Sequence, residues 1–303
     1  MTRVAAVDVG TNSVRLLVAE RGAPLDVVDR AMTITRLGAG VDANGRLDDA
    51  ALARTLDCIA AYADRWAELG AQRIRITATS AIRDAADRER FFDGVRGRTG
   101  VSAEVLTGEE EARTTFRGAV ASIDGTPPYV VLDIGGGSTE FIRGTVEPET
   151  MTSRQLGCVR VTERCLTSDP PTSAEILAAN DVIGLELDAV EHLVAPAFAR
   201  TLIGVAGTVT TLGALHLGLD GYDPKRVHGM RIGVDDVVAL TASLAGMSVA
   251  ERAALGPVQS GREDVIVGGA LILCRAMKRF GFTAVLVSEA DILDGLALGL
   301  LNW

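Results

Sequence analysis

The chain has 303 residues, a hydrophobic share of 48% and a formal net charge of −10. These values allow a large core in two domains, and no run of about 18 uncharged apolar residues predicts a transmembrane helix. The acidic balance argues against nucleic acid and against an anionic membrane surface as partners. Four scattered cysteines form no CxxC pair. Neither a zinc site nor a disulfide framework is therefore expected, and reduced thiols favour the cytoplasm.

The first half of the chain alternates between predicted strands and helices. Residues 4–10 read as a buried strand that ends at Asp8 and a glycine, which leaves no room for a signal peptide. A second strand follows over 13–20, and a loop rich in Gly and Asp covers 36–46. Apolar spacing then predicts a helix from 52 to about 70, a strand over 73–77, a helix over 81–96, a strand over 103–106 and a helix over 108–122.

The segment Gly125-Thr126-Pro127-Pro128 breaks the chain and predicts a domain boundary. The residues after it repeat the opening segment at an offset of 125, as a strand, a phosphate-sized turn and a strand. The matched pairs are Asp8 with Asp133, Gly10 with Gly135 and Ser13 with Ser138. We therefore expect two α/β domains, 1–124 with a returning 289–303 and 125–288, whose two acid–glycine turns face one cleft.

Three glycine turns are candidates for phosphate binding. Glycines let backbone N–H groups approach an anion closely, because no Cβ intrudes. At the third turn, Gly207-Thr208, a strand enters a helix whose dipole favours an anion. The residues assigned to phosphate binding are Gly10, Thr11, Asn12, Ser13, Arg15, Gly135, Gly136, Gly137, Ser138, Thr139, Gly207 and Thr208.

Two acids end apolar strands just before a glycine, Asp8 and Asp133, and Glu140 lies on the strand that returns from the second turn. A buried acid without a partner is costly. Mg²⁺ takes few protein carboxylates and bridges phosphate oxygens. The sequence therefore predicts metal ligation by these three acids, with Mn²⁺ as a substitute for Mg²⁺. Capping of the turn's N–H groups is the alternative for Asp8.

A run of acids, Glu109-Glu110-Glu111, opens the helix after Gly108. Acids in a first helical turn complement the helix dipole, and spacing alone favours that interpretation over catalysis. Arg83 is also ambiguous, because it could be a surface arginine or a phosphate clamp.

Taken together, these motifs resemble the exopolyphosphatase and guanosine pentaphosphate phosphatase (Ppx/GppA) family of the actin, sugar-kinase and Hsp70 superfamily (ASKHA). The short two-domain actinobacterial exopolyphosphatases are the most similar members. The resemblance covers essentially the whole chain and rests on the motifs at residues 8–13, 36–42, 79–83, 110–112, 133–140, 157–160 and 206–208. It implies two actin-like, ribonuclease H-like domains with the active site between them.

The resemblance also implies roles for single residues, first of all a general base at Glu111. The other implied roles are metal ligation by Asp133 and Glu140, water-mediated metal support by Asp8, catalytic phosphate binding by Arg83, and further phosphate contacts by the Thr11–Ser13 turn and Arg160. Leu293 stands where the family's long members have an arginine, which puts a phosphate contact there in question.

The resulting hypothesis is an exopolyphosphatase that removes terminal phosphate from inorganic polyphosphate, with short chains favoured, by metal-assisted attack of a Glu-activated water. The alternative is a pppGpp 5′-phosphohydrolase of the stringent response. Further rivals are a kinase or actin-like ATPase that uses nucleoside triphosphates and a non-catalytic sensor of polyphosphate or an alarmone. A homodimer is left open. The arginines expected to hold a short polyphosphate stretch are Arg83, Arg154, Arg160 and Arg262.

Overall fold

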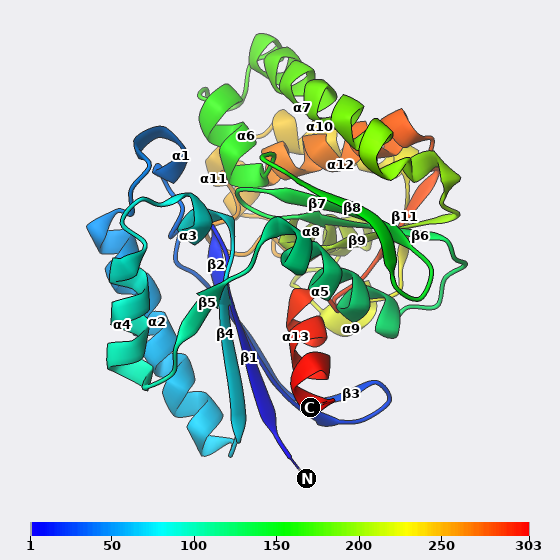
Figure 1. The fold of residues 1–303 in the computed structure, drawn as a ribbon. Coiled ribbons are helices and arrows are strands. Elements are labelled where there is room, and N and C mark those ends of the chain that lie inside the picture. Colours follow the sequence, from blue (N-terminus) through cyan, green and yellow to red (C-terminus); the bar gives the residue numbers. More distant parts are fainter. Residues whose placement is uncertain (1, 303) are drawn as a thin grey trace. The chain divides into compact units, whose positions relative to one another are not determined.

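The computed structural model describes residues 2–302, so Met1 and Trp303, the ends of the predicted first domain, lie outside it. The chain divides into two compact units (Figure 1). One unit runs up to Ser122 and resumes at Asp291, and the other covers residues 123–290. Each contains one mixed sheet, which gives an α/β protein. Within the described residues, no helix is both long enough and apolar enough to cross a membrane.

The first unit is built on a five-stranded sheet in the order β3-β2-β1-β4-β5. β1 pairs in parallel with β4, and β4 with β5, whereas β2 pairs antiparallel with both β1 and β3. The strands are β1 (Val4–Val9), β2 (Ser13–Arg21), β3 (Leu25–Ile34), β4 (Arg73–Ala78) and β5 (Ala103–Val105). The helices are α1 (Val41–Asn44), α2 (Asp49–Glu68), α3 (Ser80–Asp84), α4 (Glu89–Thr99), α5 (Gly108–Ala121) and α13 (Ile292–Leu301).

The two faces of this sheet are covered by different helices, with α2 on one side and α13 on the other (Figure 1). Val7 and Val9 of β1 belong to the core on the α2 face, whereas Val4 and Ala6 belong to the core on the α13 face. Because successive side chains of a strand point to opposite faces, Asp8 lies on the α13 face.

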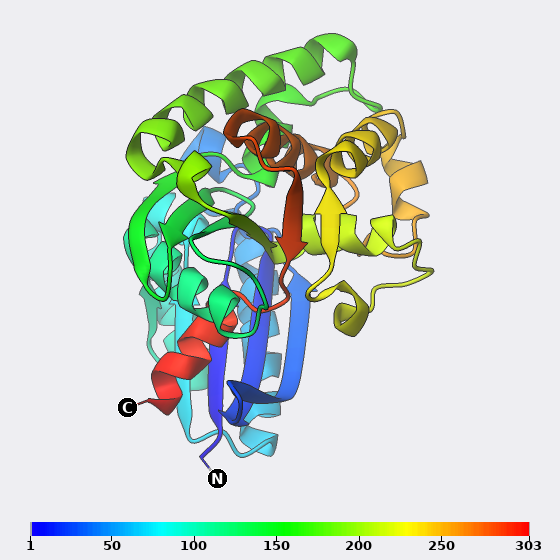
Figure 2. The same ribbon diagram turned by 90° about the vertical axis from the view of Figure 1, so that its right-hand side faces the viewer.

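The second unit is built on a six-stranded sheet in the order β10-β11-β9-β6-β7-β8. In Figure 2, α7 and α12 lie side by side over this sheet. The strands are β6 (Tyr129–Ile134), β7 (Thr139–Gly144), β8 (Pro148–Arg154), β9 (Thr201–Val205), β10 (Arg231–Gly233) and β11 (Ala284–Val287). The helices are α6 (Cys158–Cys165), α7 (Ser173–Val194), η1 (Pro196–Phe198), α8 (Ala206–His216), α9 (Pro224–Val227), α10 (Val234–Ala245), α11 (Val249–Ala253) and α12 (Ile266–Phe280).

The predicted internal repeat is confirmed by the topology of the two sheets. β8-β7-β6-β9-β11 has the same order and the same strand directions as β3-β2-β1-β4-β5, and β10 is added antiparallel at the edge. The turns match as well. The Gly10 amide donates to the Ser13 carbonyl at 2.9 Å, and the Gly135 amide donates to the Ser138 carbonyl at 3.0 Å. The shared turn geometry places Asp8 and Asp133 at equivalent positions.

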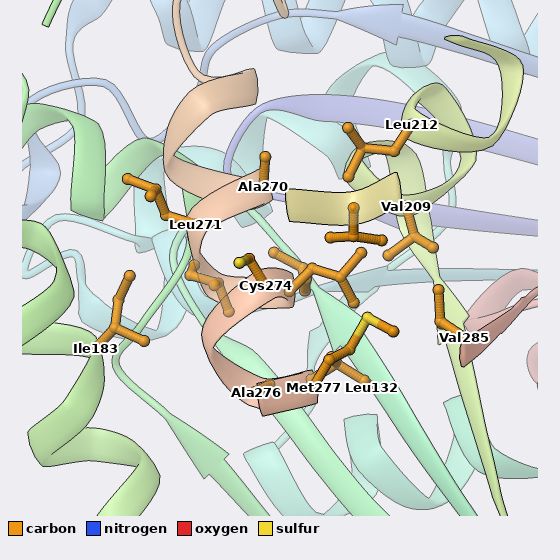
Figure 3. Packing of buried hydrophobic residues seen from close by; sticks show 14 of the residues in the cluster. Leu132, Ile183, Val209, Leu212, Ala270, Leu271, Cys274, Ala276, Met277 and Val285 are labelled. Atoms are coloured by element: carbon orange, nitrogen blue, oxygen red, sulfur yellow. The ribbon is translucent and has the colours of Figure 1, made fainter. Parts of the chain in front are cut away.

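The core of the second unit fixes the strand that carries Asp133. Figure 3 shows Met277 of α12 beside Leu132 of β6, and both belong to one buried cluster. Gly204 of β9 leaves room for Val209 and Val285, because a Cβ at that position would come within 2.8 Å of either side chain. Close packing of this kind resists displacement of the strands.

One prediction for the first unit is wrong, one is incomplete, and one strand was not predicted. The loop expected over 36–46 contains the short helix α1. The single helix expected over 81–96 is two helices, α3 and α4, because the Ala86 amide bonds the Gly45 carbonyl at 2.9 Å and Ala85 is extended. No strand was predicted over residues 25–34, where β3 forms the sheet edge.

Candidate active site

The glycine turn of the second unit is enclosed by the start of α6. The Cys158 amide donates to the Gly135 carbonyl at 2.9 Å. A Cβ at Gly157 would lie 2.2 Å from the Gly136 carbonyl oxygen, so only glycine allows this close approach. Ser138 is buried beside the turn, and the buried Thr139 hydroxyl donates to the Leu156 carbonyl. Neighbouring backbone therefore holds the turn in one conformation.

Arg160, expected to contact the distal part of a phosphate chain, supports the same turn from within the protein. Its Nε donates to the Gly137 carbonyl at 2.8 Å, and the residue is 9% exposed. A buried arginine bonded to a carbonyl of the turn helps to orient the neighbouring peptide groups.

Asp133 and Glu140 lie directly opposite each other in the β6–β7 pair. They are 6% and 1% exposed, and Glu140 Oε1 accepts a hydrogen bond from Ser153 Oγ at 2.6 Å. Like charges directly opposite each other destabilise a sheet, and burial strengthens the repulsion. This pair therefore suits a cation.

In the first unit, the equivalent acid has an arginine opposite it. Arg15 pairs with Asp8 in the β1–β2 register, and its Nη2 and Nε lie 2.6 and 3.1 Å from Asp8 Oδ2. The same guanidinium also bonds Asp291 at the start of α13. Burial raises the pKa of Asp8, and Arg15 offsets that effect only in part. Asp8 Oδ1 is buried with no hydrogen-bond partner within residues 2–302.

The Gly10–Ser13 turn of the first unit is backed by the loop that follows β3. The Asn12 carbonyl accepts from the Arg36 amide at 2.9 Å, and the Gly38 amide donates to the Thr11 carbonyl at 2.8 Å. A Cβ at Gly38 would lie 2.2 Å from the Thr11 side chain. Arg36 has a φ of 55°, a left-handed conformation that non-glycine residues adopt at a cost. This strained loop fixes the carbonyl side of the turn.

The three acids at the start of α5 have three different environments. Glu109 is 69% exposed and pairs with Arg113 at 3.1 Å. Glu110 forms a capping box with Thr107. The side chain of Glu111 is only 9% exposed, and its Oε2 lies 3.2 Å from Nη1 of Arg83. Of the three, only Glu111 is both buried and in contact with the second candidate residue, Arg83.

The third turn has the features of an anion site at a helix start. Ala206 has a φ of 66°, and α8 begins there without a side-chain cap at Val205. The Val205 side chain therefore does not cap the first amides of α8, as is typical where a helix start binds an anion. The Arg262 guanidinium packs over Gly207, where a Cβ would be 1.5 Å from Nη1. A side chain at 207 would displace this arginine.

The donor set is suited to a magnesium ion that keeps its own waters. Within residues 2–302, no group of three or more His, Cys, Asp or Glu side chains could enclose a metal ion. Mg²⁺ needs no such cage, because one or two carboxylates and the substrate phosphates hold it together with water. In the second unit, the facing carboxylates of Asp133 and Glu140 fit that requirement.

Comparison with known proteins agrees with these motifs. Residues 16–302 match the model of the Ppx/GppA phosphatase family. The chain is 45% identical to exopolyphosphatase 2 of Mycobacterium tuberculosis, over 99% of either chain. It is similar to the crystal structure of an exopolyphosphatase-like protein, with 37% identity, a TM-score of 0.96 and 99% coverage of both chains. It is also similar to the crystal structure of the Aquifex aeolicus Ppx/GppA family member, with 29% identity and a TM-score of 0.84. The match covers 99% of this chain and 98% of that chain. The chain belongs to the Ppx/GppA phosphatase family.

Proposed function

We propose that the protein is an exopolyphosphatase that hydrolyses the terminal phosphoanhydride of inorganic polyphosphate. The observation that carries this proposal is the buried carboxylate pair of Asp133 and Glu140 beside the Gly135–Ser138 turn. Such a pair favours a cation, and the turn favours an anion. A metal-bound phosphoryl group satisfies both, and the similarity to exopolyphosphatase 2 extends over the full chain.

Phosphate binding is assigned to the three turns and to arginine. The backbone amides of residues 10–13 and 135–138 would donate to phosphoryl oxygens, and the first turn of α8 would add its amides and its dipole. Arg83 would add a guanidinium group that can bind two phosphate oxygens, and Arg262 beside Gly207 would add another. Within each unit the fold holds these groups in place, so they would stabilise transition-state charge with little local reorganisation.

Glu111 is assigned the role of general base, which removes a proton from the attacking water. Its neighbours serve other purposes, because Glu110 caps the helix and Glu109 pairs with Arg113 on the surface. A positioned base contributes roughly 10²–10⁴-fold to the rate. The rest of the acceleration in phosphoryl transfer comes from placement and from charge stabilisation.

Mg²⁺, with Mn²⁺ as a substitute, is assigned to Asp133 and Glu140, with support from Asp8. The ion would neutralise phosphoryl oxygens that the acidic protein would otherwise repel. The protein's own contribution is to hold the carboxylates, as Ser153 does for Glu140. All four cysteines are free thiols, which suits a reducing compartment, so we place the reaction in the cytoplasm.

Phosphate release from four substrates tests this proposal against its rivals. The substrates are tripolyphosphate, a long polyphosphate, pppGpp and ATP, each with Mg²⁺ and with excess EDTA. The proposal expects the highest kcat/KM on a polyphosphate and none without metal. A preference for pppGpp would favour the alarmone phosphohydrolase. Turnover of ATP alone would favour an ATPase, and tight binding without turnover would favour a sensor.

A further inference from the structure

Arg83 contacts Glu111 through one nitrogen of its guanidinium, and the same nitrogen also contacts the backbone. Nη1 lies 3.2 Å from Glu111 Oε2 and donates to the Leu106 carbonyl at 2.9 Å. The Arg83 side chain is 22% exposed, whereas that of Glu111 is 9% exposed. The arginine therefore connects an enclosed carboxylate to a more open position.

Backbone hydrogen bonds hold the segments on both sides of this contact. The Leu106 amide donates to the Ala78 carbonyl at 3.0 Å, which extends the β4–β5 pairing by one residue. The Arg83 amide donates to the Thr79 carbonyl at 3.0 Å at the start of α3. If the guanidinium moved toward a ligand, it would lose both Nη1 contacts at once.

The rest of the guanidinium is not used by the protein. Among residues 2–302, Nε and Nη2 of Arg83 make no hydrogen bond. Neither atom is among the fully buried polar atoms that lack a partner. An Nε–Nη2 edge is the side of a guanidinium that binds two oxygens of a phosphate at once.

We propose that Arg83 is the positioning residue of the general base, with Nη1 aiming the Glu111 carboxylate while Nε and Nη2 hold a phosphoryl group. This inference rests on the proposed function of the site. A single planar group would then set the distance between base and phosphate, instead of two independent side chains. Placement errors of about 1 Å near reacting atoms cost on the order of 10²-fold in rate.

The substitution Arg83→Lys separates positioning from phosphate binding. Lysine keeps the charge for the phosphate but places its donors on one flexible atom, so it cannot reproduce the fixed spacing between base and phosphate that the planar guanidinium sets. We expect kcat on tripolyphosphate to fall by about 10²-fold, with KM changed by less than about threefold. In a Glu111→Gln background there is no base to aim, so the same substitution should change the residual kcat by less than about threefold.

A matched control is available on α5. Arg113 pairs with Glu109 at 3.1 Å, another arginine–carboxylate contact, but both side chains are exposed. Arg113→Lys should leave kcat and KM unchanged. Melting temperatures are measured for every variant. If Arg83→Lys is unfolded, Arg83→Met replaces it. Methionine also removes the phosphate contact and should raise KM, but its loss of kcat must be smaller in the Glu111→Gln background than in the wild type.

Two results would overturn the inference while leaving the proposed function intact. A rise in KM without a fall in kcat would mean that Arg83 only binds phosphate. Equal losses of kcat with and without Glu111 would mean that Arg83 acts independently of the base. Absence of phosphate release by the wild-type protein is a different failure, because it would overturn the proposed function and this inference together.

Discussion

Asp133 and Glu140 lie directly opposite each other on β6 and β7, both buried, whereas Asp8 has Arg15 opposite it at the equivalent register position. The internal repeat therefore pairs its acid with an arginine in one unit and with a second carboxylate in the other. Arg15 offsets the burial of Asp8 in part. In the second unit, the repulsion between two facing carboxylates favours a bound cation at Asp133 and Glu140.

The variant Glu140→Gln tests this assignment. We expect the Mg²⁺ concentration for half-maximal activity to rise by about 10–100-fold, by analogy with the loss of groups that support metal ligands. In EDTA, the variant should be as stable as the wild type or more stable, because one of two facing charges is gone. Ser153→Ala removes the hydroxyl that holds Glu140 and should shift the Mg²⁺ requirement in the same direction, but less. An unchanged Mg²⁺ requirement in both variants would remove Glu140 from the metal site.

The variant Glu111→Gln tests the general base. Its kcat should fall by about 10²–10⁴-fold, while polyphosphate binding is retained because the phosphate contacts are untouched. Glu109→Gln is the matched control, since it removes the same charge from an exposed position on the same helical turn. Retention of more than about a tenth of kcat by Glu111→Gln would contradict the role of this residue.

The buried carboxyl of Asp8 should make stability depend on pH in an unusual direction. Burial raises the pKa of Asp8, so the folded protein keeps this proton at a pH where the unfolded chain releases it. Asp8 therefore contributes fully to the free energy of unfolding below the ordinary pKa of an aspartate. This contribution is lost as pH rises through the pKa of Asp8 in the folded protein. We compare the melting temperature of Asp8→Asn with that of the wild type, both in EDTA. The difference, variant minus wild type, should be more positive at about pH 7 than at about pH 4.

A second aspartate provides the control of opposite sign. The Leu47 amide lowers the pKa of Asp87, and Arg90 lowers it further. Its contribution is present above the ordinary pKa and is lost as pH falls. The loss of melting temperature caused by Asp87→Asn should therefore be largest at about pH 7 and become smaller as pH falls. If both variants showed the same pH trend, the assignment for Asp8 would be wrong.

Local sequence patterns were sufficient to predict the elements that carry the turns. The apolar runs before Asp8 and Asp133 predicted β1 and β6, and their repeat predicted the equivalent turns. A strand entering a helix near Gly207 also predicted β9 and α8 correctly. Buried strands next to glycines have a strong signal, because each residue in the run is apolar or fits a special backbone conformation.

Tertiary contacts decided the features that the sequence did not reveal. β3 carries three charges, which interrupt the apolar alternation, and it lies at the sheet edge. The break between α3 and α4 depends on the bond from Ala86 to Gly45, which is distant in sequence. The contacts of Arg83 with Glu111 and of Ser153 with Glu140 likewise join residues on different elements. No local periodicity encodes such pairs, so the partners within the candidate site emerged only from the fold.

The last prediction concerns the length of polyphosphate that the protein can hold. Affinity for a polyanion grows with the number of phosphates that arginine neutralises. All four arginines expected to bind the chain already have protein partners. Arg154 pairs with Glu186 at 2.6 Å, and Arg160 bonds the Gly137 carbonyl. Arg83 contacts Glu111, and Arg262 donates to Gln259 Oε1 at 3.3 Å. We therefore expect kcat/KM per chain to stop rising after a few phosphates, and cleavage of long polyphosphate to be distributive.

Gel analysis of a long polyphosphate at partial digestion measures this directly. Distributive cleavage releases a ladder of intermediate lengths, because each chain dissociates after one or a few turnovers. Arg154→Gln should leave the ladder unchanged, since its guanidinium already serves Glu186. Full-length substrate with free phosphate and no intermediates would instead show processive cleavage. That result would require a basic track along the chain that holds polyphosphate between successive hydrolyses.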